Sequence, residues 1–431
     1  MIYESWGFKG NPFSPASLPA NELGQRLLVG RATELKSLSV RIQSGPKLAT
    51  VEGLNGVGKT SIVNVASFNL YERHLTTKEG PLYIPCRKIF QLDPTKSLDE
   101  FIDQVFLEVA QTLIDSAEAV KVHGSYLRSR GVELWLNSPQ LQTFSGGISL
   151  VQFGSSAEQN TGNGFERSGF RKTVSGWLEQ VFKEDSPGGV ICVIDNLELL
   201  QSSETAKQLL EKLRDELFNV AGLRWVLCGA LGIVYGVVSS PRLEGMLHTP
   251  IEIGEIADDL APDILASRIE AYAQSPTLAP YLPLRADDFE LLYSILSGNL
   301  RSVLSQADRY CTWAYDNPLP QTEDDKAVSF TTWLTDESTS FLRTSRAAVG
   351  RKAMQIFSQA CQLGNFSPGD FESFGYASVQ ALRPPIRELE NVGLLVSTQD
   401  ETDKRRKTIQ VTAKGWFVKH ALNAEATTSL A

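Results

Sequence analysis

The chain has 431 residues, of which 42% are hydrophobic, and this is enough apolar material for more than one hydrophobic core. Its net charge of −9 excludes a global positive field, so binding to nucleic acid or acidic lipid would require a local basic patch. Five scattered cysteines without a CxxC spacing and four histidines outside any HExxH pattern argue against a disulfide framework and a protein-built transition-metal site.

The N-terminal part of the chain predicts an irregular segment and then a helix. Residues 1–24 are rich in proline and are expected to form an irregular lead. They lack the basic and apolar stretches of a signal peptide, and no later run approaches a membrane span, so we expect a cytoplasmic protein without a membrane partner. Apolar residues at helical spacing follow, with Thr33 and Glu34 near the start and Ser44 after the end.

Five short apolar runs predict strands, at residues 47–53, 81–86, 189–195, 223–229 and 250–254. Amphipathic helical patterns separate most of them, and this alternation is typical of a parallel sheet that is covered on both faces. The stretch at about 117–170 is rich in Gly, Ser and Asn and predicts an inserted hairpin or loop. We therefore expect an α/β core over residues 25–255 with this insertion.

From residue 256 onward the pattern becomes helical. Residues 256–325 predict a small helical domain, and a polar, acidic linker is expected around residues 319–330. Residues 340–425 then predict three helices and two short strands around a charged tip, which is the pattern of a winged helix. The sequence contains no internal repeat at a fixed period.

The stretch VEGLNGVGKTSIVN, residues 51–64, has the spacing and context of a phosphate-binding loop between a strand and a helix. Its glycines let backbone amides wrap phosphates, Lys59 would neutralise the β- and γ-phosphates, and Thr60 would offer its hydroxyl to Mg²⁺. The candidate nucleotide-binding residues here are Gly53, Asn55, Gly56, Val57, Gly58, Lys59, Thr60 and Ser61. ATP and Mg²⁺ are the expected cofactors.

Asp195 ends the predicted strand VICVID, where a carboxylate at the carboxyl edge of a parallel sheet can meet the Mg²⁺ held by Thr60. The alternative is a strand-ending aspartate that only caps the next helix. With this pair of Walker motifs and a following helical region, the sequence resembles the AAA+ ATPases. Within them it is most similar to replication initiators of the origin-recognition type and to bacterial transposition ATPases.

This resemblance implies a fold class and three further site residues. The fold would be an α/β P-loop NTPase core with an AAA+-like parallel sheet, a helical lid and a C-terminal winged-helix domain. The segment from Val29 to Arg31 would lie near the adenine, with Arg31 as the candidate contact. Arg301 would serve as the sensor 2 arginine of the lid, and Arg242 would be an arginine finger that completes a neighbour's site. A homo-oligomer is therefore expected. For Arg301 and Arg242 the alternative is an ordinary exposed arginine.

One departure from the AAA+ pattern concerns hydrolysis. The residue after Asp195 is usually a glutamate that orients the attacking water, but here it is Asn196. Glu198 could replace it only if the backbone turned it back toward the γ-phosphate; otherwise it is a solvated carboxylate. Cys228 and Gly229 stand where a polar sensor 1 side chain would be expected. We therefore expect a held nucleotide with slow turnover.

The C-terminal region carries the local basic patch. Residues 343–419 contain 12 Lys/Arg and 7 Asp/Glu, a balance of +5 in a chain of net charge −9. Such segregation suits a module that faces phosphates. Because Pro384 disfavours helical angles at Arg383, we expect the recognition helix to start at the two prolines 384 and 385. The candidate DNA-binding residues are Gln380, Arg383 and Arg387 near that helix start, and Lys404, Arg405, Arg406 and Lys407 at the wing.

Three functions are compatible with these patterns. The first is an ATP-gated AAA+ protein that binds duplex DNA through the winged helix. The second is a signal-transducing NTPase switch, as in defence or stress systems, whose winged helix contacts a protein partner. The third is a scaffold that keeps ATP as a structural ligand. The basic wing favours the first.

Overall fold

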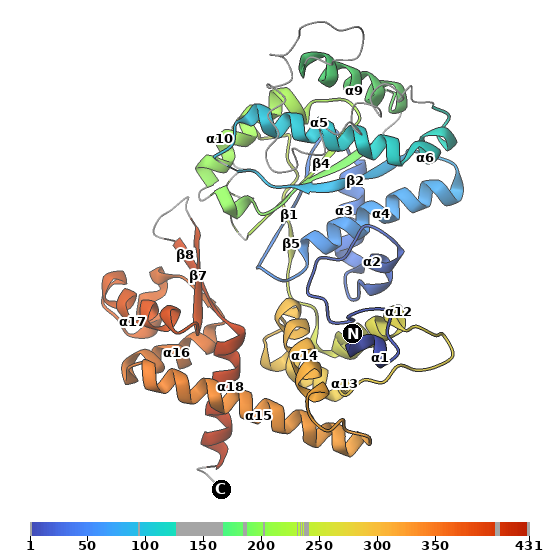
Figure 1. The fold of residues 1–431 in the computed structure, drawn as a ribbon. Helices are drawn as coiled ribbons and strands as arrows, with labels where there is room; N and C mark the ends of the chain where they lie inside the picture. Colours follow the sequence, from blue (N-terminus) through green and yellow to red (C-terminus); the bar gives the residue numbers. More distant parts are fainter. Residues whose placement is uncertain are drawn as a thin grey trace, which may run out of the picture.

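The computed structural model describes residues 2–93, 95–125, 167–183, 188–200, 203–230, 241–400 and 406–428, together with 232, 234 and 236. Five parallel strands form the central sheet in the order β2-β3-β4-β1-β5 (Figure 1). They are β1 (Ala49–Gly53), β2 (Tyr83–Phe90), β3 (Gly189–Ile194), β4 (Leu223–Gly229) and β5 (Ile251–Ile253). The predicted parallel sheet and its five strands are confirmed, and β2 continues beyond its predicted end.

Both faces of the sheet are covered because its strands are apolar on both sides. In β3, Ile191 and Val193 belong to one hydrophobic cluster, whereas Cys192 and Ile194 belong to the other. This is the period-two alternation of a strand. One cluster packs on α3 (Ala32–Gln43) and α4 (Lys59–Thr77). The other packs on α5 (Leu98–Asp115), α6 (Ala117–Val122), α9 (Arg167–Val181), α10 (Ser203–Leu213) and η3 (Arg214–Phe218).

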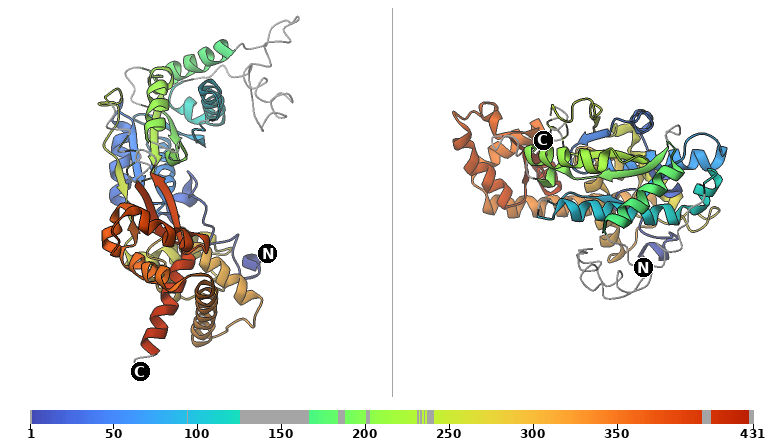
Figure 2. Two further views of the ribbon diagram at one scale, coloured as in Figure 1. Left: turned by 90° about the vertical axis from the view of Figure 1, so that its left-hand side faces the viewer. Right: turned by 90° about the horizontal axis from the view of Figure 1, so that it is seen from above.

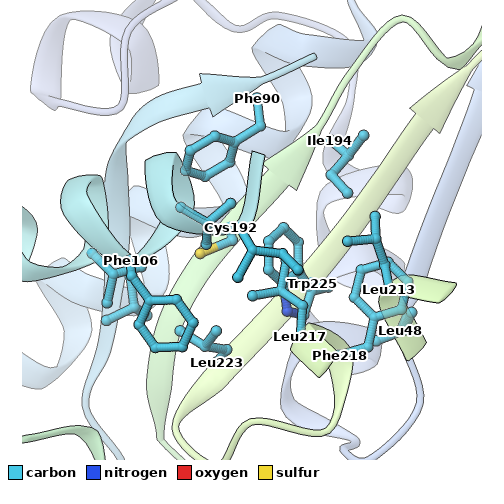
Figure 3. Packing of buried hydrophobic residues seen from close by; sticks show 14 of the residues in the cluster. Leu48, Phe90, Phe106, Cys192, Ile194, Leu213, Leu217, Phe218, Leu223 and Trp225 are labelled. Carbon is cyan, nitrogen blue, oxygen red and sulfur yellow. The ribbon is translucent and has the colours of Figure 1, made fainter. Parts of the chain in front are cut away.

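Large aromatic side chains fill the second cluster. Trp225 of β4 lies edge-on to Phe218, with ring centroids 5.4 Å apart, and also contacts Phe90 (Figure 3). Burying a side chain of this size contributes about 1.5–3 kcal/mol. The sheet is therefore a rigid base for the loops at the carboxyl ends of its strands.

The helical region that follows the sheet has a core of its own. It contains η4 (Asp258–Leu260), α12 (Ala261–Tyr272), α13 (Ala286–Ile295) and α14 (Leu300–Tyr315), and we call it the lid. The N-terminal residues complete this core: α1 (Ile2–Ser5) and the segment after it bury Trp6, Phe8 and Phe13 against the lid. The lead is mostly irregular, as expected, but its aromatic side chains bind it to the lid. It ends where α2 (Glu22–Leu27) begins.

A long helix joins the lid to the C-terminal region. α15 (Glu323–Ala348) starts with a capping box between Thr322 and Asp325, so most of the predicted linker at 319–330 is helical. The acidic run forms the first turn of this helix, where carboxylates are favourable. α15 crosses the predicted domain limits at 325 and 340.

The C-terminal elements are α16 (Arg351–Leu363), β6 (Asn365–Phe366), η5 (Pro368–Phe374), α17 (Val379–Asn391), β7 (Leu395–Asp400), β8 (Arg406–Val411) and α18 (Ala413–Thr428). The three strands form an antiparallel sheet in the order β6-β8-β7. Two views place α9 and the end of α18 at opposite ends of an elongated molecule (Figures 1 and 2). Within the described ranges, no helix is both long and apolar enough to cross a membrane.

The start of α17 differs from the sequence prediction. The helix begins at Val379, after the N-cap Ser378, so the two prolines lie inside the helix rather than in its first turn. Two facts explain why the prolines do not set the helix start. The Ser378 side chain accepts a hydrogen bond from Ala381 N, and Leu382, Ile386 and Leu389 are buried at helical spacing.

Candidate functional site

The phosphate-binding loop runs from the end of β1 to the start of α4. Gly56 and Gly58 have φ angles of 90° and 97°, in the left-handed region that favours glycine. Gly53 is required for another reason: a Cβ atom there would lie 2.5 Å from the carbonyl oxygen of Ile253 in β5. The loop is therefore shaped by its glycines and held against the neighbouring strand, with the N-terminus of α4 following directly.

Lys59 and Thr60 begin α4 and face different partners. The Lys59 ammonium is buried and donates to the carbonyl oxygens of Gly53 (2.9 Å) and Leu54 (3.1 Å). The Thr60 hydroxyl donates to Oδ2 of Asp195 at 2.6 Å. The sequence predicts these groups for one site, and the fold brings them together from β1, α4 and the end of β3. The core has a P-loop NTPase fold.

The buried carboxylate of Asp195 is oriented by its own backbone. Its side chain is 5% exposed, and its Oδ1 accepts a hydrogen bond from Asn196 N at 2.8 Å. A hydroxyl and a carboxylate side by side are hard oxygen ligands of the kind that Mg²⁺ prefers. In the described part of the chain, no cluster of three or more His, Cys, Asp or Glu side chains offers another metal site.

A cavity next to the loop collects residues from the sheet, the lid and the N-terminal lead. Residues 55–62 of the loop and α4 line it, together with Arg301 and Asn196. Of the residues predicted for the nucleotide site, Gly53 and Asp195 are not among those that line the cavity. Val29, expected near the adenine, also lines it. Its other walls include apolar side chains and N-terminal residues that the sequence analysis did not select: Pro15, Ala16, Ser17, Leu18, Leu27, Leu28, Ile256, Ile264, Leu300 and Leu304.

Two residues that were predicted to contact the nucleotide, Arg31 and Ser61, form hydrogen bonds within the chain. The Arg31 guanidinium lines the cavity and donates to the carbonyl oxygens of Val57 (3.3 Å) and Gly254 (2.6 Å). It therefore braces the phosphate-binding loop against the end of β5. The Ser61 hydroxyl accepts from Leu18 N at 3.0 Å and so fixes the N-terminal lead to α4. Both residues position other groups around the cavity.

The lid contacts the phosphate-binding loop through the N-terminus of α14. Asn299 caps this helix, accepting from Ser302 N, and its Nδ2 donates to the carbonyl oxygen of Asn55 at 3.1 Å. A Cβ on Gly56 would lie 2.8 Å from Oδ1 of Asn299 and 3.3 Å from Cβ of Arg301. The predicted sensor 2 arginine thus begins the helix that covers the loop. Sequence analysis missed Asn299, although an asparagine before a helical pattern is a capping signal.

Glu198 is turned toward the next strand. Asn196 has a φ angle of 57°, and the chain then enters the short helix η2 (Leu197–Leu200). Oε2 of Glu198 accepts a hydrogen bond from Ala230 N, at the end of β4, at 3.0 Å. Asn196 lines the cavity, whereas Glu198 does not. Cys228, near these carboxylates, is fully buried, and burial raises the pKa of its thiol well above the usual value.

Arg242 lies on the surface, away from this chain's own cavity. Its side chain is 61% exposed and its NH1 lies 3.6 Å from Oε2 of Glu211. The backbone oxygen of Arg242 accepts from Arg214 at 3.0 Å, which holds the segment against the core. An arginine finger has to be exposed, as Arg242 is. An ordinary surface arginine paired with a carboxylate is exposed in the same way.

The predicted DNA-contacting residues fall on two elements. Gln380, Arg383 and Arg387 are exposed on α17, at the spacing that puts them on one side of a helix. Lys404 and Arg405 lie outside the described residues. Arg406 and Lys407 begin β8, and their side chains also lie outside the described part.

No protein-family profile matches the sequence. No curated protein matches it either. Similar solved structures include ORC1 of Aeropyrum pernix in complex with DNA, with 16% identity, 97% of each chain covered and a TM-score of 0.43. ORC2 of the same organism, in ADPNP and ADP complexes, has 11% identity, 97% and 99% coverage and a TM-score of 0.46. CDC6P of Pyrobaculum aerophilum has 14% identity, 96% and 98% coverage and a TM-score of 0.40. At these identities the similarity concerns the fold alone.

Proposed function

We propose that this chain is an ATP-binding AAA+ protein with slow hydrolysis, in which nucleotide-dependent assembly controls duplex DNA binding through a winged helix. The observation that carries the nucleotide part is the hydrogen bond between Thr60 and Asp195, made beside a glycine-shaped loop and under the lid. Triphosphate oxygens would meet the amides at the start of α4 and the Lys59 ammonium. Arg301 would approach them from the lid.

The residues around Asp195 fit Mg²⁺. Thr60 would provide its hydroxyl oxygen and Asp195 a carboxylate oxygen. These two oxygens already lie 2.6 Å apart, joined by a hydrogen bond. Bound there, the ion would neutralise charge on the β- and γ-phosphates. The Lys59 ammonium would exchange its present carbonyl partners for phosphate oxygens, which are stronger acceptors because they are charged.

Slow hydrolysis is proposed because no carboxylate among the described residues lines the cavity in the position of a base. Asn196 cannot take a proton, and Glu198 accepts from Ala230 N instead. To activate water, Glu198 would have to leave this hydrogen bond. The bond holds it at the end of β4, between the strands that carry the loop and Asp195.

We expect purified protein to bind ATP with Mg²⁺ but to turn it over well below the typical enzyme rate of about 10 per second. If Glu198 is the base for this residual turnover, Glu198→Gln should lower the rate by about 100-fold or more. Phosphate release is the measurement, and Glu290→Gln on the exposed side of α13 is the matched control. Brisk turnover that Glu198→Gln leaves unchanged would contradict this assignment.

Nucleotide-dependent assembly is proposed from the exposure of Arg242. With ATP, light scattering should detect a species larger than the monomer, and Arg242→Ala should lose it while still binding ATP. The reason is that an arginine finger acts on the neighbour's γ-phosphate, so its loss weakens the interface and not the chain's own site. Arg26→Ala is the control, because Arg26 is also exposed and paired with a carboxylate, Glu270. A monomer under every nucleotide condition would remove Arg242 from this role.

DNA binding is supported by the exposed side of α17 and by the basic balance of residues 343–419. The test is a titration of labelled duplex of random sequence against protein with and without ATP, at several salt concentrations. We expect salt-dependent binding that ATP strengthens.

A second candidate, the protein-contacting switch, is favoured by one contact: Phe417 of α18 is buried in the lid core. Absence of duplex binding in both nucleotide states would favour this switch.

A further inference from the structure

A second arginine of the lid lines the cavity, and no motif pointed to it. Arg268 lies on α12, one turn after Ile264, and its side chain is 3% exposed. Its NH1 donates to the carbonyl oxygen of Pro12 at 2.7 Å. Its Nε has no hydrogen-bond partner, and no described carboxylate lies within ion-pair distance. Burial lowers its pKa to about 10.

A buried guanidinium of this kind is costly unless another group compensates its charge. The hydrogen bond to Pro12 satisfies one of its five donors, and a neutral donor would do the same with less desolvation. A structural role therefore explains the contact with the N-terminal lead but leaves Nε without a partner. A ligand that brings hydrogen-bond acceptors into the cavity would supply partners for the donors that remain.

The position of Arg268 indicates which part of a ligand it would meet. The phosphate end of the cavity is defined by the glycine loop, Lys59 and Arg301. The side chains of Leu18, Leu27 and Ile264 form apolar walls that suit the flat face of a base. Arg268 shares the buried, cavity-lining side of α12 with Ile264 and is tied to the lead that brings Leu18 to the cavity.

We propose that Arg268 recognises the nucleoside part of the bound nucleotide. Its guanidinium would donate to ring nitrogens of the purine or to ribose oxygens, while Lys59 and Arg301 bind the phosphates. This inference rests on the proposed nucleotide-binding function. It names a specificity contact that links the lid, the N-terminal lead and the nucleoside.

The test compares two ligands, ATP and inorganic tripolyphosphate, in the full chain with Mg²⁺. Both are measured by competition with a fluorescent ATP analogue. Arg268→Met keeps the length of the side chain without its donors and should weaken ATP binding by about 10- to 100-fold, the scale of one hydrogen bond to a charged group. Binding of tripolyphosphate should change by less than about 2-fold, because the proposal places Arg268 at the nucleoside and not at the phosphates. Lys59→Ala should weaken both ligands.

Asn11→Ala is the matched control for the N-terminal lead. Asn11 donates to Asp308 at 2.9 Å and does not line the cavity, so its loss loosens the lead without removing a ligand contact. ATP affinity should stay near wild type in this variant. Without ligand, the thermal midpoint of Arg268→Met should equal or exceed that of wild type, because a buried charge has been removed.

Three outcomes would overturn the proposal. Equal weakening of ATP and tripolyphosphate by Arg268→Met would show a general effect on the site. A lower thermal midpoint with unchanged ATP affinity, or the same ATP loss in Asn11→Ala, would show that Arg268 only holds the lead. If Arg268→Met does not fold, Arg268→Lys takes its place. This variant should show a smaller loss of affinity, again for ATP and not for tripolyphosphate. Misfolding of both variants would show that Arg268 has a structural role. Failure of wild type to bind either ligand would instead refute the proposed function.

Discussion

Replacing Lys59 with alanine should abolish measurable ATP binding in the presence of Mg²⁺. The ammonium is buried beside the phosphate-binding loop, where its present partners are two carbonyl oxygens, and phosphate oxygens would replace them. Hydrogen bonds to charged groups contribute about 1.5–3 kcal/mol each, so losing two predicts a loss of at least about 100-fold. Calorimetric titration is the measurement.

Two further variants separate this effect from a loss of folding. Lys59→Met keeps the aliphatic stem and should lose ATP binding as Lys59→Ala does. Lys36→Ala, on the exposed side of α3, should bind like wild type. The thermal midpoint without ligand reports whether the loop still folds once Gly53 and Leu54 lose their donor. Wild-type affinity in a folded Lys59→Ala variant would refute the nucleotide site.

Replacing Lys404, Arg405, Arg406 and Lys407 with alanine should weaken duplex binding for all sequences alike and flatten its salt dependence. Cations that meet phosphates release counterions, and each contact adds about 0.9 to the slope of log affinity against log salt on B-DNA. Four lost contacts would lower that slope by roughly 3 to 4 units. The measurement is a salt titration of labelled duplex against ATP-loaded wild type and variant.

The matched controls for the wing variant are single arginine substitutions on the helix α17. Arg383→Ala or Arg387→Ala should change the preference among sequences if either side chain reaches a base edge, and should leave most of the salt slope. A smaller drop in slope for the wing variant would mean that part of the basic run faces solvent. Identical slopes for wild type and the wing variant would refute the wing assignment.

The sequence by itself predicted the residues whose place depends on a pattern within a single strand, helix or loop. The five apolar runs become the five strands, and the glycine spacing gives a loop whose residues 56 and 58 need positive φ angles. Asp195 and Thr60 are 135 residues apart, yet their meeting was predictable. The carboxyl ends of parallel strands share one edge of a sheet, so a strand-ending carboxylate must lie beside the loop.

Local patterns misled where tertiary contacts outweighed them. Pro384 and Pro385 predicted a later start for α17, but a serine cap and three buried side chains set it at Val379. The acidic run at 323–325 suggested a linker, but it forms the first turn of α15, which a capping box starts and which packs on α18. In α17, burial of an apolar stripe contributed more than the local preference of the backbone. In α15, the capping box was a local signal that the sequence analysis did not use.

Only the tertiary structure decided how the cavity is closed and which further residues line it. Asn299 meets Asn55 across 244 residues, and Arg268 meets Pro12 across 256. No sequence motif encodes either contact. Each depends on how the lid packs on the core or on the N-terminal lead. The bond between Glu198 and Ala230 N likewise depends on two neighbouring strand ends. A sequence pattern records spacing along one segment, whereas these contacts arise from the burial of apolar surface between segments far apart in the chain.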